Sequence, residues 1–188
     1  MRTLVAFIGL LAFVCGAQAK TIHIVAFGDS ATEGWLVDRK DAYPAQLQRM
    51  LRGKGYDVSV TNAGISGDTT KGALARFDEA IGPDTDIALV ELGTNDLRMH
   101  VPAAIMHTNL TAIVQTLRRR GIEVLLIGLG SLNLSRVAKE NGIPYAQWKL
   151  PAGKFRASDG QHFNAQGYRI VVTRMLPQVE ILIQRKHR

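Results

Sequence analysis

Two short polar blocks, far apart in the sequence, contain the residue types that hydrolyse esters through a serine. Gly28-Asp29-Ser30 supplies a hydroxyl, and Asp159-Gly160-Gln161-His162 supplies an imidazole with a carboxylate three residues before it. A serine hydroxyl is a weak nucleophile until a neighbouring base takes its proton. A three-residue offset across one tight turn can bring a carboxylate to the Nδ1 of the histidine. Each block alone is also ordinary loop chemistry, because Ser30 could cap a helix and Asp159 could close a surface turn.

Two further blocks contain groups that could donate hydrogen bonds to a reacting carbonyl oxygen. They are Asn62-Ala63-Gly64-Ile65-Ser66-Gly67-Asp68-Thr69 and Gly93-Thr94-Asn95-Asp96. Acyl transfer needs such donors because negative charge develops on that oxygen in the transition state. Gly67 suits the task, since a residue without a Cβ lets its backbone approach a substrate closely. Taken singly, Gly67 and Asn95 are better explained as turn residues.

The four blocks are separated by short apolar runs and longer amphipathic segments. The apolar runs predict strands at 22–27, 58–60, 87–92, 122–127 and 143–146. The amphipathic segments predict helices at 43–52, 69–81, 102–120, 134–141 and 164–183. Strands that alternate with helices indicate the α/β class, here a three-layer α/β/α sandwich around a parallel sheet of about five strands. Ligands bind at the carboxyl ends of such strands, where three of the blocks lie; the fourth precedes the last helix.

Together the four blocks resemble the SGNH (GDSL) hydrolase family, and they occur in the order that the family has. The resemblance spans nearly the whole chain after the first nineteen residues. It is closest to the small exported lysophospholipases, thioesterases and arylesterases. It implies the SGNH hydrolase fold with a flavodoxin-like strand order. It also implies hydrolysis of carboxylic esters or thioesters without a cofactor or metal. No G-x-S-x-G surrounds Ser30, which rules out the nucleophile elbow of the α/β-hydrolases.

The resemblance assigns a role to each candidate residue. Ser30 is implied as the nucleophile, His162 as the general base and Asp159 as the partner that orients the imidazole. The implied oxyanion donors are the backbone N–H groups of Ser30 and Gly67 and the side-chain amide of Asn95.

Three aspartates of the blocks are expected to fix the loops as hydrogen-bond acceptors, not to form a catalytic carboxylate pair. They are Asp29, Asp68 and Asp96. The remaining histidines show no metal-ligand spacing, so we expect no metal site.

The first nineteen residues have the pattern of a signal peptide. Arg2 precedes an apolar stretch from Leu4 to Val14, and Ala17-Gln18-Ala19 is a small-residue cleavage pattern. We therefore expect a signal peptide at 1–19, a hydrolase domain at 20–188, and a protein exported to the periplasm or medium without a stable membrane anchor. An uncleaved anchor and a lipid anchor at Cys15 are weaker alternatives. Cleavage would remove Cys15, the single cysteine.

Length and composition fit one ordinary globular domain. The chain has 188 residues, of which 46% are hydrophobic and 21% charged, and its net charge is +7. Because no aromatic residues interleave the basic ones in a patch, we interpret the charge as a solvated basic surface and expect no nucleic-acid partner. The expected partner is a small-molecule ester or thioester, and the oligomeric state is left open.

Two departures from the family pattern concern the shape of the site. Phe163 follows His162 where many relatives have proline, which could alter the wall beside the base. The segment 128–158 is short, which predicts an open, shallow site that prefers short acyl groups. Trp35 and Trp148 either line that site or serve ordinary packing.

Three alternatives remain. The first is an esterase that removes acetyl groups from carbohydrate or cell-wall polymers. The second, of another class, is a non-catalytic envelope-binding protein, which would be expected to lack part of the four blocks. The third is a flavodoxin-like nucleotide binder, disfavoured because no G-x-G-x-x-G follows the first predicted strand.

Overall fold

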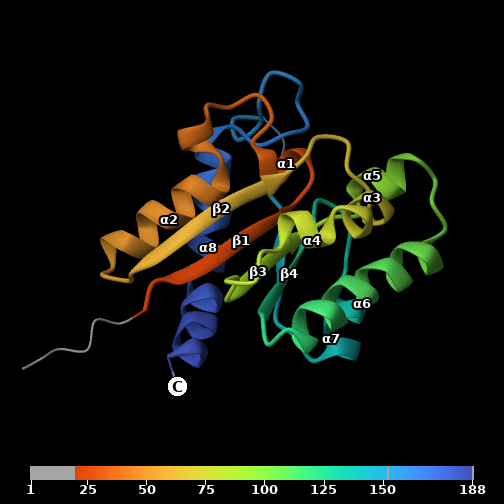
Figure 1. The fold of residues 1–188 in the computed structure, drawn as a ribbon. Coiled ribbons are helices and arrows are strands. Elements are labelled where there is room, and N and C mark those ends of the chain that lie inside the picture. Colours follow the sequence, from red (N-terminus) through yellow and green to blue (C-terminus); the bar gives the residue numbers. More distant parts are fainter. Residues whose placement is uncertain (1–19, 152, 188) are drawn as a thin grey trace, which may run out of the picture.

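Five parallel strands form a single central sheet in the computed structural model, which describes residues 20–151 and 153–187 (Figure 1). The predicted signal peptide, residues 1–19, lies outside the described residues. The strands are β1 (Ile22–Gly28), β2 (Val58–Gly64), β3 (Ile87–Glu91), β4 (Glu123–Leu129) and β5 (Tyr145–Trp148). Their order, β2-β1-β3-β4-β5, is that of flavodoxin-like sheets. The predicted three-layer α/β/α sandwich is confirmed.

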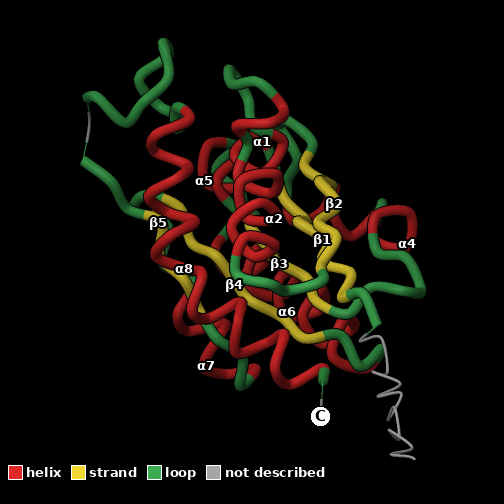
Figure 2. Tube along the Cα trace, turned by 90° about the vertical axis from the view of Figure 1, so that its left-hand side faces the viewer, coloured by secondary structure: helices red, strands yellow, loops and turns green. Residues whose placement is uncertain are grey.

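Helices cover both faces of the sheet. They are α1 (Ser30–Glu33), α2 (Tyr43–Gly53), α3 (Thr70–Ala75), α4 (Phe77–Ala80), α5 (Thr94–Arg98), α6 (Ala103–Arg119), α7 (Ser135–Asn141) and α8 (Ala165–Lys186), with a 3-10 turn at Arg39–Asp41. Figure 2 looks onto α2 and α8, which lie across one face; α3, α4, α6 and α7 pack on the other. No described helix is both long enough and apolar enough to cross a membrane.

The strands are apolar on both sides, which is why they read as nearly continuous hydrophobic runs. In β1, Ile24 and Ala26 pack toward α2 and α8, whereas Val25 and Phe27 pack toward α3, α4 and α6. Because side chains alternate along a strand, each strand contributes to two separate cores. All five residues of β3 are buried, as a central strand between two helical layers requires.

The structure differs from the predicted elements at several points. The predicted helix 69–81 is wrong as a single element, because Arg76 leaves helical geometry (φ −106°, ψ 14°) between α3 and α4. The last strand lies at 145–148, two residues later than predicted. The short helices α1 and α5 were not predicted, since each occupies only the turn that follows a strand.

The carboxyl ends of the first three strands are level with one another. Gly28 pairs in register with Gly64 on one side and with Glu91 on the other. Gly28 has no room for a side chain: a Cβ would lie 2.5 Å from the carbonyl oxygen of Glu91 and closer still to Thr32 Oγ1. This close approach lets α1 fold directly over the end of β1, so the loops that follow these strands emerge side by side.

Replacing Gly28 with alanine should lower the free energy of unfolding by about 1–3 kcal/mol, because the added methyl group overpacks a site walled by backbone. Urea denaturation of the purified protein measures this. Gly53→Ala is the matched control, since nothing lies within 4 Å of a Cβ at the end of α2. The control should be neutral or slightly stabilising. Equal stability of the two variants would contradict the close approach.

Candidate active site

The structure brings Ser30, His162 and Asp159 into one hydrogen-bonded chain. Ser30 Oγ lies 2.8 Å from His162 Nε2, although the two residues are 132 positions apart in the sequence. His162 Nδ1 lies 2.5 Å from Asp159 Oδ2. With Nδ1–H donating to the carboxylate, Nε2 is free to accept the hydroxyl proton of Ser30. This is the geometry that activates a serine for attack on an acyl carbon.

Asp159 is held as an ion by its surroundings. The hydrogen bond from His162, together with backbone N–H groups of Gln161 and His162, lowers the pKa of Asp159 to about 2. Those backbone groups donate to Oδ1 at 2.9 and 3.0 Å, so the carboxylate closes a tight turn and also orients the imidazole. Asp159 therefore closes a surface turn with Oδ1 and contacts the imidazole with Oδ2.

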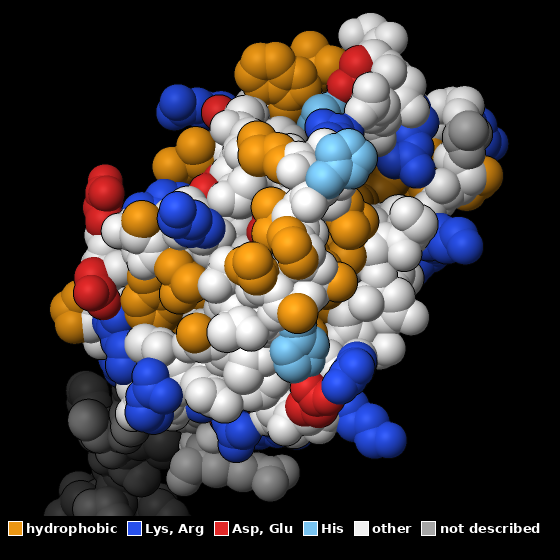
Figure 3. All heavy atoms as spheres, turned by 90° about the vertical axis from the view of Figure 1, so that its right-hand side faces the viewer, with side chains coloured by type: hydrophobic (Ala, Val, Ile, Leu, Met, Phe, Trp, Pro, Cys, Tyr) orange, Lys and Arg blue, Asp and Glu red, His pale blue; other side chains and the backbone are white. Residues whose placement is uncertain are grey.

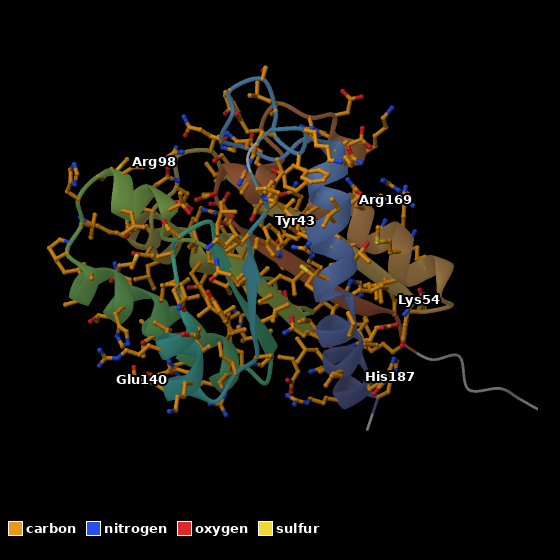
Figure 4. All side chains as sticks on the ribbon, turned by 180° about the vertical axis from the view of Figure 1, so that it is seen from behind. Tyr43, Lys54, Arg98, Glu140, Arg169 and His187 are labelled. Carbon is orange, nitrogen blue, oxygen red and sulfur yellow. The ribbon has the colours of Figure 1, made fainter. Side chains whose placement is uncertain are left out.

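The loop that carries His162 is anchored from the start of α8. Asn164 caps this helix by accepting from the N–H of Gly167, and its amide donates to the carbonyl oxygens of Lys154 and Arg156. Phe163 is almost fully buried, contrary to a role confined to the wall of the site. Its ring packs edge-on against Trp148 and Tyr168, in the core that also holds Tyr43 beside α8 (Figure 4). Phe163 thus fixes the backbone next to the base.

Asp29 fixes the turn that presents Ser30. Its Oδ1 accepts from the N–H of Ala31 at 2.9 Å, which caps α1. Its Oδ2 accepts from Asn95 Nδ2 at 3.2 Å. The expected loop-fixing roles are confirmed for all three aspartates. Asp68 accepts from Arg76 Nε at 2.7 Å, and Asp96 accepts from the N–H and the hydroxyl of Thr70 at 2.9 and 2.6 Å.

A second carboxyl group, Glu91, is buried against Asp29 at the end of β3. Burial, and next the charge of Asp29, raise the pKa of Glu91 well above its usual value of 4.5. Burial also raises the pKa of Asp29, against its hydrogen bonds with Ala31 and Glu91. Two adjacent buried carboxylates cannot both ionise, so Glu91 keeps the shared proton and donates to Asp29. Its Oε2 accepts from Thr32 Oγ1 at 3.0 Å.

The three candidate oxyanion donors lie at the ends of adjacent strands. The backbone N–H groups of Ser30 and Gly67 donate to no acceptor within the described part of the chain. Gly67 has a φ of +80°, a conformation that suits glycine. Asn95 Nδ2 is engaged with the carbonyl oxygen of Asp68 at 2.8 Å and with Asp29 at 3.2 Å. Among the described residues the two backbone donors therefore have no acceptor, and the amide is held in place beside them.

Two residues that the sequence did not single out hold the loop containing Gly67. Glu33 accepts from both the N–H and the hydroxyl of Ser66. Arg76 reaches Asp68 and the carbonyl oxygens of Ala63 and Gly28, at 2.7 to 3.0 Å. No local motif marks either residue. Glu91 could have been noticed in the sequence, because it is the one acidic residue in the apolar run 87–92.

The surface over Ser30 is a shallow hollow of about 30 Å³. Its lining includes His162, Phe163, Thr94 and two arginines, Arg98 and Arg156. Trp148 belongs to the core and does not line it. Trp35 is 48% exposed and lines a different hollow, of about 540 Å³, between α1, α2 and β2.

Potential metal ligands are not grouped near this site in the part of the chain that the structure describes. Among residues 20–151 and 153–187, no group of three or more His, Cys, Asp or Glu could hold a metal ion. His107 pairs with Glu140 at 2.6 Å, and His23 lies 3.9 Å from Asp84, both away from Ser30 in the fold.

Comparisons with known proteins identify the family of the chain. The model of the GDSL-like Lipase/Acylhydrolase family matches residues 26–170. Esterase TesA of Pseudomonas aeruginosa is 39% identical over 115 residues; the alignment spans 60% of this chain but only 56% of that relative. Thioesterase 1/protease 1/lysophospholipase L1 of Escherichia coli is 30% identical over 196 aligned positions, covering 94% of this chain and 91% of the relative. A crystal structure of TesA superposes with a TM-score of 0.76 and 26% identity, over 85% of this chain and 99% of that one.

The shared proton of Glu91 predicts a pH dependence of stability. As pH rises above about 4.5, the unfolded chain loses the proton of Glu91 while the folded protein keeps it, so stability falls until the raised pKa is passed. Glu91→Gln keeps a donor to Asp29 and an acceptor for Thr32 but cannot ionise. Its free energy of unfolding should therefore fall less than that of the wild type between about pH 5 and about pH 8. Urea denaturation at both values measures this, and an identical fall in the two proteins would contradict the assignment.

Proposed function

The chain belongs to the GDSL-like lipase/acylhydrolase family, and we propose that it hydrolyses carboxylic esters or thioesters through an acyl-Ser30 intermediate. The observation that carries the proposal is the hydrogen-bonded chain from Ser30 through His162 to Asp159, with distances of 2.8 and 2.5 Å. Relatives named esterase and thioesterase support the reaction class. The residues that do the chemistry are assigned from their geometry.

In the first step, Ser30 Oγ attacks the acyl carbon while its proton passes to His162 Nε2. The imidazolium that forms is stabilised by Asp159, whose low pKa keeps it ionised throughout. His162 then gives the proton to the leaving oxygen or sulfur. The bond to the alcohol or thiol breaks, and the acyl group stays on Ser30. No cofactor is needed for this exchange.

Negative charge on the carbonyl oxygen is stabilised by donors that are already in place. The N–H groups of Ser30 and Gly67, which have no acceptor in the described part of the chain, supply two of them. Asn95 supplies the third when its longer hydrogen bond, 3.2 Å to Asp29, is exchanged for one to the oxyanion. Preorganised donors of this kind typically contribute a factor of about 100 to 1000 each.

In the second step, water replaces the alcohol or thiol. His162 takes a proton from the water, the hydroxide attacks the acyl carbon, and Ser30 Oγ leaves with the proton returned by His162. The products are a carboxylic acid and the free enzyme. The short segment 128–158 leaves little chain to cover an acyl group, so we expect a preference for short acyl groups.

We also propose that residues 1–19 are a signal peptide and that residues 20–188 form the exported hydrolase domain. The support is the pattern of Arg2, the apolar stretch and Ala17-Gln18-Ala19. Expression of the full chain in a bacterial host should give a periplasmic or secreted protein whose first residue is Lys20. Edman sequencing identifies that residue; an intact N-terminus in the membrane fraction would contradict cleavage.

The purified domain should hydrolyse p-nitrophenyl esters, with the highest kcat/KM between acetate and butyrate and a steep decline toward palmitate. Ser30→Ala should lower kcat by a factor of about 10⁴ or more without changing the fold, since it removes the nucleophile. Circular dichroism and urea denaturation of the variant check the fold. Full activity of Ser30→Ala would overturn the mechanism.

Inactivity of the wild-type domain on all of these esters would shift the assignment to other reactions or classes. Release of acetate from acetylated polysaccharide would then favour the carbohydrate esterase. Inactivity on both kinds of substrate would favour the non-catalytic binding protein.

A further inference from the structure

Two arginines line the hollow over Ser30, one from α5 and one from the loop before α8. Arg98 and Arg156 both contact Gln161, the residue that precedes His162. Arg98 donates to the side-chain oxygen of Gln161, and Arg156 Nη1 donates to its carbonyl oxygen at 2.8 Å. Positive charge from two separate elements thus converges on the nucleophile and its base.

Neither arginine has a carboxylate partner within the described residues. No ion pair of Arg98 or Arg156 is formed there, whereas Arg76, Arg120, Arg136 and Arg185 each pair with an acid. Asp159 and Asp29 lie near the hollow, but Asp159 is engaged by His162 and Asp29 is buried. Lys149 and Lys154, on the loop that carries Arg156, also lack an acidic partner in the described part of the chain.

The two guanidinium groups differ in how many donors they have left. Arg156 uses two N–H groups on carbonyl oxygens and lies 4.5 Å above the ring of Phe163, so its position is fixed by the protein. Arg98 makes one hydrogen bond, to Gln161, and is exposed. Because a guanidinium carries five N–H donors, most of those on Arg98 are available to a ligand. In Figure 3, which looks onto α5 and α6, Lys and Arg side chains lie beside His side chains at the upper end of the molecule.

The mechanism fixes which part of a substrate meets these arginines. His162 gives its proton to the leaving oxygen or sulfur, so the alcohol or thiol part must lie on the His162 side of Ser30. Gln161, which directly precedes His162, contacts both Arg98 and Arg156 and lines the hollow with them. Of the three oxyanion donors, two are N–H groups from the turn at Ser30 and the loop at Gly67, and the third, Asn95, lies three residues before Arg98 on α5.

We propose that Arg98 and Arg156 together bind an anionic group, a carboxylate or phosphate, on the alcohol or thiol part of the substrate. Arg98 donates to the anion directly, and Arg156 adds positive charge from a fixed position. Guanidinium groups match carboxylate and phosphate oxygens in geometry and hold them by charge-assisted hydrogen bonds. The proposal rests on the esterase function proposed above and names the class of ester that the site prefers.

Matched pairs of esters test the proposal. p-Acetoxybenzoate carries a carboxylate on the alcohol part, and its methyl ester is the neutral counterpart. p-Nitrophenyl hydrogen glutarate carries a carboxylate on the acyl part, with p-nitrophenyl pentanoate as the neutral counterpart. The measured quantity is the ratio of kcat/KM for the anionic ester to that for the neutral ester. Intrinsic differences in reactivity cancel when this ratio is compared between variants.

Arg98→Gln should lower the ratio for the acetoxybenzoate pair about five- to tenfold and leave the ratio for the acyl-side pair within about twofold. Arg98→Lys should retain part of the preference, because it keeps the charge without the planar fork. Salt at about 0.5 M should lower the wild-type ratio toward that of Arg98→Gln. Arg169→Gln, the matched control, removes the same charge from α8 on the opposite side of the molecule (Figure 4) and should change neither ratio.

Equal losses on the anionic and neutral acetoxybenzoates would overturn the proposal, since Arg98 would then only position the loop of His162. A loss confined to the acyl-side pair would overturn it too, because the anion would be on the other part of the substrate. Failure of the wild type to hydrolyse any neutral ester would instead count against the esterase function itself.

Discussion

The buried carboxylate of Asp29 connects every part of the nucleophile side of the site. It caps α1, accepts from Asn95, and shares a proton with Glu91 at the end of β3. Only 1% of Asp29 is exposed, so water cannot stabilise its charge and the protein must supply the hydrogen bonds. Those bonds come from α1, which follows β1, from the end of β3, and from α5, which follows β3. The position of Ser30 therefore depends on the level ends of the parallel strands, and the strands depend on the two apolar cores that flank them.

The base side of the site is built differently. His162 and Asp159, whose side chains are 13% and 27% exposed, lie in a loop that pairs with none of the five described strands. Its position comes from three anchors: the cap of α8 at Asn164, the buried ring of Phe163, and the two carbonyl contacts of Arg156. One half of the site is thus fixed by the sheet and the other by side chains that tie a loop to the core. The 2.8 Å contact between Ser30 and His162 is where the two halves meet.

Charged groups are placed differently on the two sides of the site. Beneath Ser30 the carboxyl groups are buried and one of them stays protonated, so the net charge there is kept small. Beside His162, Arg98 is exposed, and neither Arg98 nor Arg156 has an ion-pair partner among the described residues. Asp159 stays ionised at a pKa of about 2 because it is hydrogen-bonded and not because it is buried.

The sequence by itself determined the features that depend on neighbouring residues. Apolar runs identified the strands, and the four blocks named Ser30, Asp159, His162, Gly67 and Asn95 as candidates. These signals are local, since strand propensity, helix capping and tight turns act over a few residues. The same local view failed at Arg76, where contacts with the ends of β1 and β2 accompany the break in a predicted helix.

Only the tertiary structure decided which side chains meet across distant segments. In the sequence, Glu91 is only an acidic residue at the end of an apolar run. The pairing of β1 with β3 places it beside Asp29. Glu33 and Arg98 belong to no motif. The order of the strands places Glu33 against the Gly67 loop and Arg98 at the hollow that His162 lines. Burial and electrostatic environment are set by this three-dimensional proximity, so pKa shifts and unpaired cations cannot be predicted from the spacing of residues along the chain.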